Sequence, residues 1–188
     1  MSLEPRYESP LHYQKQVKEL GDHLIVREIH RPVQLNLRGE PIKDFAAKVS
    51  SVLGCPVPLA PGTYSQTGDC KIFWLGPDEW FICAESDVGS LALALRSTLS
   101  GHVALTDVSG GYTSISLSGS AAVMLLKQAT VYDFERWPTA DQVSGRVAQT
   151  TFAKTGVMLN NCADGSFELT VRRSYADYVA RWITKSLG

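Results

Sequence analysis

Apolar and polar positions follow two different periods along this chain, and each change of period marks a new element. Residues 33–38 (VQLNLR) alternate between apolar and polar side chains, which is the pattern of a half-buried strand. The next stretch, from about Ile42 to Leu53, carries apolar residues at helical spacing and is followed by Gly54, a residue typical of helix ends. The sequence therefore predicts a strand followed by a helix.

The same reasoning predicts four further elements. Residues 71–75 and 79–84 are rich in strand-forming side chains and are joined by Gly76-Pro77-Asp78, a connection that predicts a hairpin. A helix is expected over about 88–99, and a strand over 103–106. The complete order is strand, helix, strand, strand, helix, strand, which is the split βαβ arrangement of a ferredoxin-like lobe.

A second lobe of similar order is expected in the C-terminal half. Its predicted strands cover 112–117, 146–153, 157–160 and 167–171, and its two predicted helices follow Ser118 and Ser174. No connection between the lobes is polar or long enough to separate independent domains. We therefore expect an α+β fold made of two tandem ferredoxin-like lobes.

These patterns also set the expected boundaries. The lobes should cover about 33–107 and 112–188, within one two-lobed domain that spans 23–188. Residues 55–69 contain three prolines and two glycines and are expected to form a surface loop. Residues 1–22 are polar, with little to fold upon, and are expected to form an N-terminal arm that orders on another subunit.

Composition narrows the class of protein. The chain has 188 residues, of which 44% are hydrophobic and 20% charged, values close to those of globular domains. Its formal net charge of −1 gives no basic excess for nucleic acid or an anionic membrane surface. No apolar run approaches the roughly 20 residues of a membrane-spanning helix, and no secretion signal is recognised, so we expect a cytoplasmic protein.

Few residue patterns indicate chemistry. The four cysteines form no Cys-x-x-Cys pair, and we expect free thiols packed as small hydrophobes. None of the four histidines has a partner at metal-ligand spacing, so no metal site is predicted. Neither a nucleophile elbow nor a phosphate-binding loop occurs. No catalytic residue is therefore assigned.

Asp107 is one candidate for binding. It ends a predicted strand directly before Ser109-Gly110-Gly111, where glycines allow a ligand to approach the backbone. The alternative is a structural role, in which its carboxylate bonds the next backbone amides in a turn. Among the four tryptophans, Trp74 and Trp80 bracket the predicted hairpin and are either core residues or anchors for a partner.

Four motifs can be compared with known families: Trp74 to Trp80 (WLGPDEW), Asp107 to Tyr112 (DVSGGY), Leu117-Ser118-Gly119, and Phe167 to Ala176 (FELTVRRSYA). Together they resemble the motifs of the gamma subunit family of heterotetrameric sarcosine oxidase. The same segments are similar, more distantly, to the folate-binding domain of the glycine-cleavage T-protein, an aminomethyltransferase. That resemblance implies an aminomethyltransferase folate-binding-like unit, in agreement with the two predicted lobes.

The resemblance implies an assembly of alpha, beta, gamma and delta subunits that oxidises sarcosine to glycine. The methyl carbon would leave as formaldehyde or pass to tetrahydrofolate, and oxygen would become hydrogen peroxide. FAD, FMN and NAD are expected on the larger partner subunits and zinc on the smallest. The gamma subunit is then expected to be a structural partner that holds no cofactor and no catalytic residue.

Two hypotheses from different classes follow. In the first, the chain is a non-catalytic interaction subunit of the oxidase. In the second, it is a free-standing folate or pterin-binding module, in which Asp107 and Arg172 line a cleft of roughly 300–1,000 Å³ between the lobes.

The sequence departs from the family patterns at three positions. Asn160 and Asn161 stand where the T-protein pattern has an acidic pair, and Ala129 stands where gamma subunits often carry cysteine. The amides disfavour folate chemistry on this chain.

Overall fold

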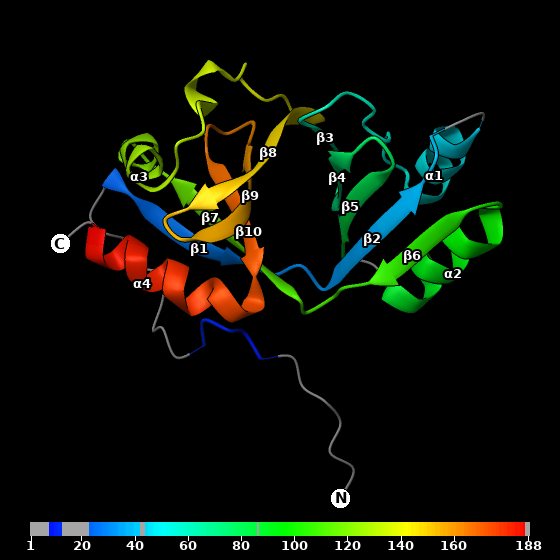
Figure 1. Cartoon of the computed structure of the whole chain (residues 1–188), viewed down its shortest axis with the longest axis horizontal. Coiled ribbons are helices and arrows are strands. Elements are labelled where there is room, and N and C mark those ends of the chain that lie inside the picture. Colours follow the sequence, from blue (N-terminus) through cyan, green and yellow to red (C-terminus); the bar gives the residue numbers. More distant parts are fainter. Residues whose placement is uncertain (1–7, 13–22, 42–43, 86, 187–188) are drawn as a thin grey trace, which may run out of the picture.

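The computed structural model describes residues 8–12, 23–41, 44–85 and 87–186. Within these ranges the chain forms a ten-stranded sheet, and every neighbouring pair of its strands is antiparallel. The strand order is β1-β7-β10-β9-β8-β3-β4-β5-β2-β6 (Figure 1). The strands are β1 (Ile25–Ile29), β2 (Val33–Gly39), β3 (Thr63–Thr67), β4 (Cys70–Gly76), β5 (Glu79–Ala84), β6 (Val103–Asp107), β7 (Tyr112–Ser118), β8 (Ser144–Phe152), β9 (Thr155–Asn161) and β10 (Phe167–Arg172).

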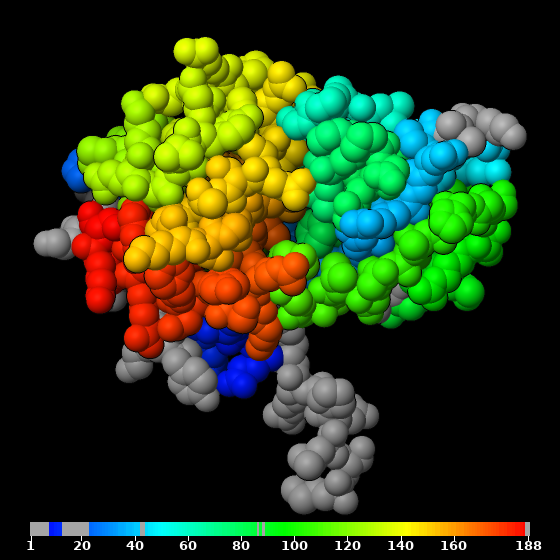
Figure 2. Space-filling view, viewed as in Figure 1, coloured from blue at the N-terminus to red at the C-terminus, as the bar shows by residue number. Residues whose placement is uncertain are grey.

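The described residues also form four α-helices: α1 (Phe45–Leu53), α2 (Val88–Thr98), α3 (Ala122–Ala129) and α4 (Ala176–Ser186). Figure 1 shows α1 and α2 beside β2 and β6, and α3 and α4 beside β1, β7 and β10. We call β2 to β6 with α1 and α2 the first half, and β1 and β7 to β10 with α3 and α4 the second half. The two halves meet where β3 pairs with β8, and they contact each other along a continuous seam (Figure 2).

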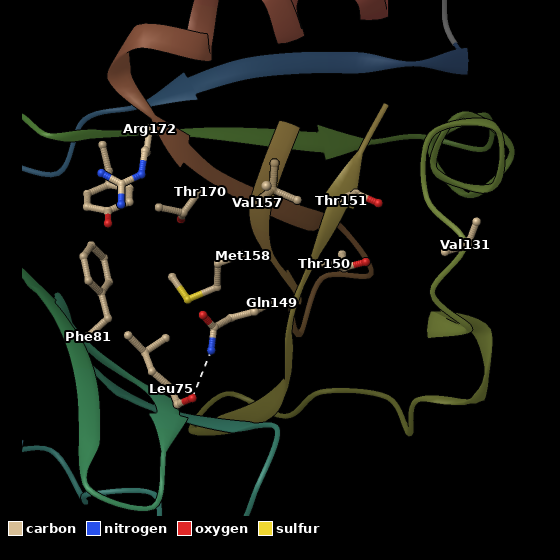
Figure 3. Close-up of a pocket in the computed structure, with 12 residues that line it drawn as sticks. Leu75, Phe81, Val131, Gln149, Thr150, Thr151, Val157, Met158, Thr170 and Arg172 are labelled. Carbon is tan, nitrogen blue, oxygen red and sulfur yellow. Dashed lines mark hydrogen bonds between the residues drawn. The ribbon is translucent and has the colours of Figure 1, made fainter. Parts of the chain in front are cut away.

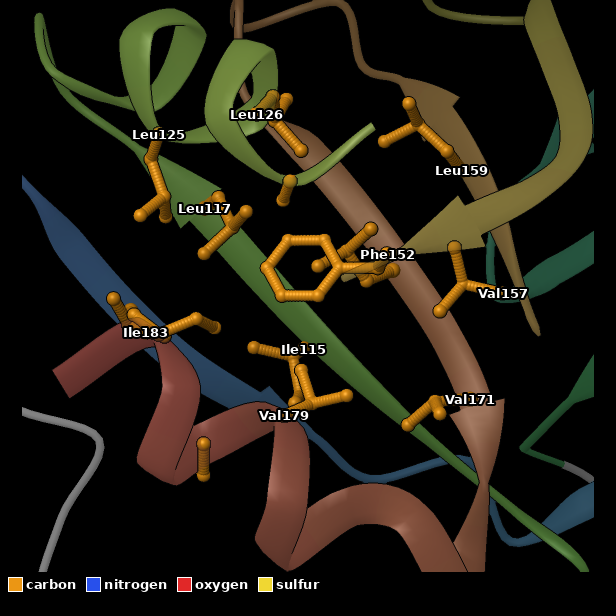
Figure 4. Close-up of a cluster of buried hydrophobic side chains, with 14 of the residues drawn as sticks. Ile115, Leu117, Leu125, Leu126, Phe152, Val157, Leu159, Val171, Val179 and Ile183 are labelled. Carbon is orange, nitrogen blue, oxygen red and sulfur yellow. The ribbon is translucent and has the colours of Figure 1, made fainter. Parts of the chain in front are cut away.

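Each half buries its own hydrophobic core between sheet and helices. In the second half, Phe152 and Leu159 pack with side chains from α3 and α4 (Figure 4). In the first half, Trp80 is fully buried, its ring 5.4 Å from that of Phe45. The Trp80 indole donates a hydrogen bond to Pro58 O at 2.8 Å, which fixes the loop after α1. Trp80 is thus a core residue, and its polar atom is satisfied.

Most of the elements follow from the sequence pattern. The predicted hairpin is confirmed, since Trp74 pairs with Trp80 across β4 and β5. Helix α1 ends at Gly54, whose φ of 62° is the left-handed conformation that glycine adopts easily. Helix α2 begins after Asp87, whose carboxylate accepts a 2.7 Å hydrogen bond from Ser90 N.

Two strands were not predicted. Residues 63–67 were expected to be loop but form β3, which pairs with β4 on one side and β8 on the other. These pairings give the backbone of this largely polar segment its hydrogen-bond partners. The strand propensity of its residues alone would not predict a strand. β1 lies at the sheet edge and pairs only with β7.

The N-terminal segment that the structure describes, residues 8–12, packs on the same chain. Leu11 is buried in the second-half core. The Ser9 hydroxyl donates a 2.5 Å hydrogen bond to Glu28, and Arg173 donates one to Glu8 O. The expectation that this stretch has little to fold upon is therefore wrong for residues 8–12, while the rest of the predicted arm lies outside the described residues.

Within the described ranges, no helix has the length and apolar character needed to cross a bilayer.

Candidate functional site

Alternation along the strands places two kinds of side chain on the two faces of the sheet. On β10, Leu169 and Val171 point into the second-half core, whereas Glu168, Thr170 and Arg172 occupy the opposite face. That face is turned toward the first half, because Glu168 reaches across to β4. The inner faces of the two halves thus enclose a region with ionic, polar and aromatic side chains.

A buried ion network, which consists of Arg31, Lys71 and Glu168, joins the halves. Lys71 Nζ lies 2.8 Å from Glu168 Oε2, and Arg31 Nη2 lies 3.3 Å from each of the two carboxylate oxygens. The side chains of Lys71 and Glu168 are 5% and 2% exposed. The ammonium group also lies over the rings of Tyr64 and Phe73, at 5.1 and 5.6 Å from their centroids.

The electrostatics of the ion network are set by two cations that face one carboxylate. Burial alone would raise the pKa of Glu168, but attraction to Lys71 and Arg31 outweighs burial and holds this pKa below its usual range. Glu168 is therefore ionised at neutral pH. Arg31 is also attracted by Glu85, so Glu168 is not the only acidic group that acts on it.

Further polar groups lie on this inner face. Ser114 and Thr170 share a hydrogen bond at 3.0 Å between β7 and β10. Gln34 donates its amide to Tyr112 O at 3.3 Å, whereas its Oε1 has no hydrogen-bond partner among the described residues. Asn160 Oδ1 and Arg31 Nε are likewise buried without a partner in that part of the chain. The inner face is thus polar at its centre.

Next to the ion network lies a cavity of about 660 Å³, which we call the central cavity. Figure 3 shows Leu75 and Phe81 from the first half opposite Met158 and Gln149 from the second half. Gln149 Nε2 donates a 2.9 Å hydrogen bond to Leu75 O across the seam. The complete lining consists of Leu75, Phe81, Tyr112, Val131, Gln149, Thr150, Thr151, Gly156, Val157, Met158, Thr170 and Arg172.

Charge in the central cavity comes from Arg172. Its guanidinium lies 5.6 Å from the centroid of the Tyr112 ring, a cation–π distance. None of the lining residues is an aspartate or a glutamate. A guanidinium stays protonated at physiological pH, so the cavity combines an apolar lining with one permanent positive charge.

The two binding candidates from the sequence have different places in the structure. Arg172 lines the central cavity, but Asp107 does not. Asp107 Oδ1 accepts a hydrogen bond from Ser109 N at 2.9 Å, the contact expected of a turn residue. Of the two roles considered for Asp107, the structure therefore shows the one in which its carboxylate accepts a backbone hydrogen bond in a turn.

The cysteines are free, as predicted. Cys83 lies on β5 near the ion network, and burial raises the pKa of its thiol to about 12, so this thiol is neutral at physiological pH. Contacts with Cys70 and Thr67 lower the pKa of Cys55 to about 7, but Cys55 is only 1% exposed within the first-half core. In the described ranges, no three His, Cys, Asp or Glu side chains gather in a way that would hold a metal ion.

Several residues of this region were missed by sequence reasoning. Lys71 and Glu168 are each the second residue of a strand and have apolar neighbours on both sides, and such an isolated charge is a signal for a buried ion pair. Phe81, Met158 and Gln149 gave no signal of their own. Their positions depend on how the two halves face each other.

The architecture belongs to a known class of folds. The chain is similar to glycine cleavage system aminomethyltransferase T from Bartonella henselae, with a TM-score of 0.58 at 11% identity, over 86% of this chain and 45% of that one. It is similar to a chain of heterotetrameric sarcosine oxidase from Corynebacterium sp. U-96, with a TM-score of 0.83 at 23% identity, over 96% and 94% of the two chains. The fold is therefore a mixed α/β, aminomethyltransferase-like fold with a curled antiparallel sheet.

The family follows from sequence. Residues 38–187 match the sequence model of the sarcosine oxidase, gamma subunit family, and the chain belongs to that family. Sarcosine oxidase subunit gamma of Corynebacterium sp. (strain U-96) is 26% identical over 169 residues, which cover 87% of this chain and 78% of the relative. The protein of the same name from Arthrobacter sp. is 27% identical over 166 residues, which cover 87% and 80%. The resemblance stated from the sequence motifs is confirmed.

Proposed function

We propose that this chain is the gamma subunit of a heterotetrameric sarcosine oxidase and acts there as a structural subunit without a reacting group of its own. The family match over residues 38–187 carries the proposal. The similarity to a chain of the Corynebacterium oxidase extends over nearly the whole of both chains, so they share one fold. Its partners would be the alpha, beta and delta subunits, and FAD, FMN, NAD and zinc would belong to them.

The lining of the central cavity favours a structural role. Its polar side chains are threonines, the Gln149 amide, the Tyr112 phenol and the Arg172 guanidinium. Acid–base catalysis near neutral pH is most effective when the group titrates near that pH, and amides and aliphatic hydroxyls do not. Asn160 and Asn161, which stand in place of the acidic pair of the T-protein pattern, are both buried and hydrogen-bonded within the chain.

The finer architecture is part of the same proposal. We assign a ferredoxin-like lobe to each half, with boundaries at about 33–107 and 112–188 in a domain that spans 23–188. The orders β6-β2-β5-β4 and β1-β7-β10-β9 support this assignment, since each has the antiparallel strand order of that lobe. In the second half, β1 takes the edge position that β6 has in the first. We also retain the cytoplasm as the expected compartment.

Co-expression tests the subunit proposal. The tagged chain is expected to purify with the alpha, beta and delta subunits in fixed stoichiometry, and the complex should consume oxygen with sarcosine. The isolated chain should show neither flavin absorbance nor oxygen consumption. A chain that stays monomeric in the presence of all three partners would contradict the subunit role, and turnover by the isolated chain would contradict the absence of a reacting group.

A second candidate is the folate or pterin-binding module. The observation in its favour is the central cavity, whose volume falls within the range of about 300–1,000 Å³ typical of ligand sites. Its aromatic and apolar lining, with Arg172 at one side, has the character of a site for a flat anionic ligand. Calorimetry of tetrahydrofolate with the isolated chain tests it: heat that disappears in Arg172→Met favours this candidate, and absence of heat removes it.

A further inference from the structure

The central cavity is open to partners along an apolar border. Val131, which follows α3 and lines the cavity, is 98% exposed, and the neighbouring Tyr132 is 39% exposed. Figure 3 shows Val131 on the loop beyond Thr150 and Thr151, on the side away from Arg172. Exposed apolar side chains next to a cavity are typical of surfaces that a larger partner covers.

Electrostatics restrict what can occupy the cavity. Arg172 has no ion-pair partner among the described residues, and no lining residue supplies a carboxylate. Beneath the floor, Glu168 is two positions from Thr170 on the same strand face and is paired with Lys71 and Arg31. The charge that an occupant of the cavity meets is therefore that of Arg172. An occupant with a carboxylate is favoured, and one with a cation is disfavoured, more strongly as water leaves the interface.

The remaining lining fits a polypeptide. Leu75, Phe81 and Met158 offer an apolar surface for a side chain, while the hydroxyls of Thr151 and Thr170 offer polar contacts. Aromatic residues, Met and Arg are enriched in protein interfaces, and all three occur here. We infer that the central cavity docks a segment of a partner subunit that places a carboxylate on Arg172 and an adjacent apolar side chain against Phe81 and Met158. This inference rests on the proposed function.

Binding of the full-length chain to the purified complex of the other three subunits provides the test, measured by biolayer interferometry. Arg172 is exposed in the free chain, so substitutions there leave the fold intact. We expect Arg172→Lys, which keeps the charge, to change Kd by less than about threefold. Arg172→Glu, which opposes the partner's carboxylate, should weaken binding by at least about 30-fold, with Arg172→Met between them.

Arg96→Glu is the matched control, since Arg96 is an exposed arginine on α2 that does not line the central cavity. It should bind within about twofold of the wild type. A photo-crosslinker in place of Val131 should attach, in the assembled complex, to one partner segment that has an Asp or Glu within about four residues. Both results together establish the occupant.

The failures are distinguishable. If the wild-type chain does not bind the other subunits, the subunit role fails and the inference falls with it. If the wild type binds but Arg172→Glu binds equally well, or the crosslinked segment lacks an acidic residue, the docking inference alone is wrong. If Arg172→Glu abolishes tetrahydrofolate binding by the free chain but leaves assembly unchanged, the cavity is a small-molecule site and the inference is likewise overturned.

Discussion

Replacing Glu168 by Gln removes the carboxylate from the ion network while its shape is kept. In the wild type, Glu168 neutralises Lys71 at 2.8 Å and also contacts Arg31 at 3.3 Å. The substitution leaves Lys71 without its ion-pair partner and Arg31 with only the weaker attraction of Glu85, and the side chain of Lys71 is only 5% exposed. The glutamine can accept one hydrogen bond but cannot offset the charge.

The expected magnitude follows from this burial. Breaking a buried ion pair by removal of one partner costs about 3–5 kcal/mol, because an uncompensated charge stays in the interior. For a chain of this length, 1 kcal/mol corresponds to about 2–4 °C, so Glu168→Gln should lower Tm by about 6–20 °C. Lys71→Met should cost less, because Arg31 still neutralises Glu168.

The effect depends on pH with a definite sign. The folded-state pKa of Glu168 lies below the value of about 4.3 for an unfolded glutamate, because Lys71 and Arg31 outweigh the opposing effect of burial. In that case the unfolded chain binds more protons, and the stabilisation is present above about pH 4.3. It is lost as the pH falls from there through the folded-state pKa. Stability of the wild type should therefore decline more steeply in acid than that of Glu168→Gln.

Urea denaturation at pH 7 and at pH 4 measures both effects, with tryptophan fluorescence as the signal. Glu135→Gln is the control, since Glu135 pairs with Lys127 at 2.7 Å but is 47% exposed. Its loss should cost no more than about 1 kcal/mol at either pH. The reasoning would be refuted if Glu168→Gln and Glu135→Gln were equally stable at pH 7, or if Glu168→Gln lost stability in acid as steeply as the wild type.

Three further predictions concern the packing, and each is tested by the free energy of unfolding in urea. Gly119→Ala should cost at least about 2 kcal/mol, because φ of Gly119 is +103° and a Cβ would collide with His23 O. The control is Gly156→Ala, which has open space around it and should change the free energy of unfolding by no more than about 0.5 kcal/mol. Equal costs for the two substitutions would contradict the argument. Leu11→Ala should cost about 2 kcal/mol if residues 8–12 belong to the core, and no change would show that they do not. Trp80→Phe should cost about 1–3 kcal/mol, because Pro58 O loses its donor, and an unchanged stability would mean that this carbonyl finds another donor.

The sequence predicted the elements whose pattern is local. The strand β10 has one face in the second-half core, so its apolar residues recur at every second position. The strands β4 and β5 are buried on both faces, and their continuous runs of strand-forming residues flank a turn. β3 was missed because the sequence of residues 63–67 is polar and follows several prolines. It pairs with the nearby β4 and also with β8, whose residue Arg146 is far away in the sequence from Thr63. Local patterns do not contain the second of these pairings.

The candidate site shows the same distinction at the level of single residues. Asp107 bonds Ser109 N, a contact within two positions, and its turn role was among the predicted alternatives. Lys71 and Glu168 are 97 positions apart, and their ion pair appears only when the inner faces of the two halves are known. The sequence identified Arg172 through the family resemblance and the cleft expected from it. It could not show that the guanidinium of Arg172 lies over the ring of Tyr112.

One strand face connects stability with binding in this molecule. Glu168, Thr170 and Arg172 occupy alternate positions of β10, so the ion network, the cavity floor and the cavity cation share one backbone segment. Lys71 and Leu75, which serve the same network and the same cavity from the first half, share β4. The ion pair between Lys71 and Glu168 therefore joins the two strands that bound the central cavity. A chain without this pair would keep the pairing of β3 with β8 and the hydrogen bonds from Gln149 to Leu75 O and from Gln34 to Tyr112 O, but it would lose this direct link between β4 and β10.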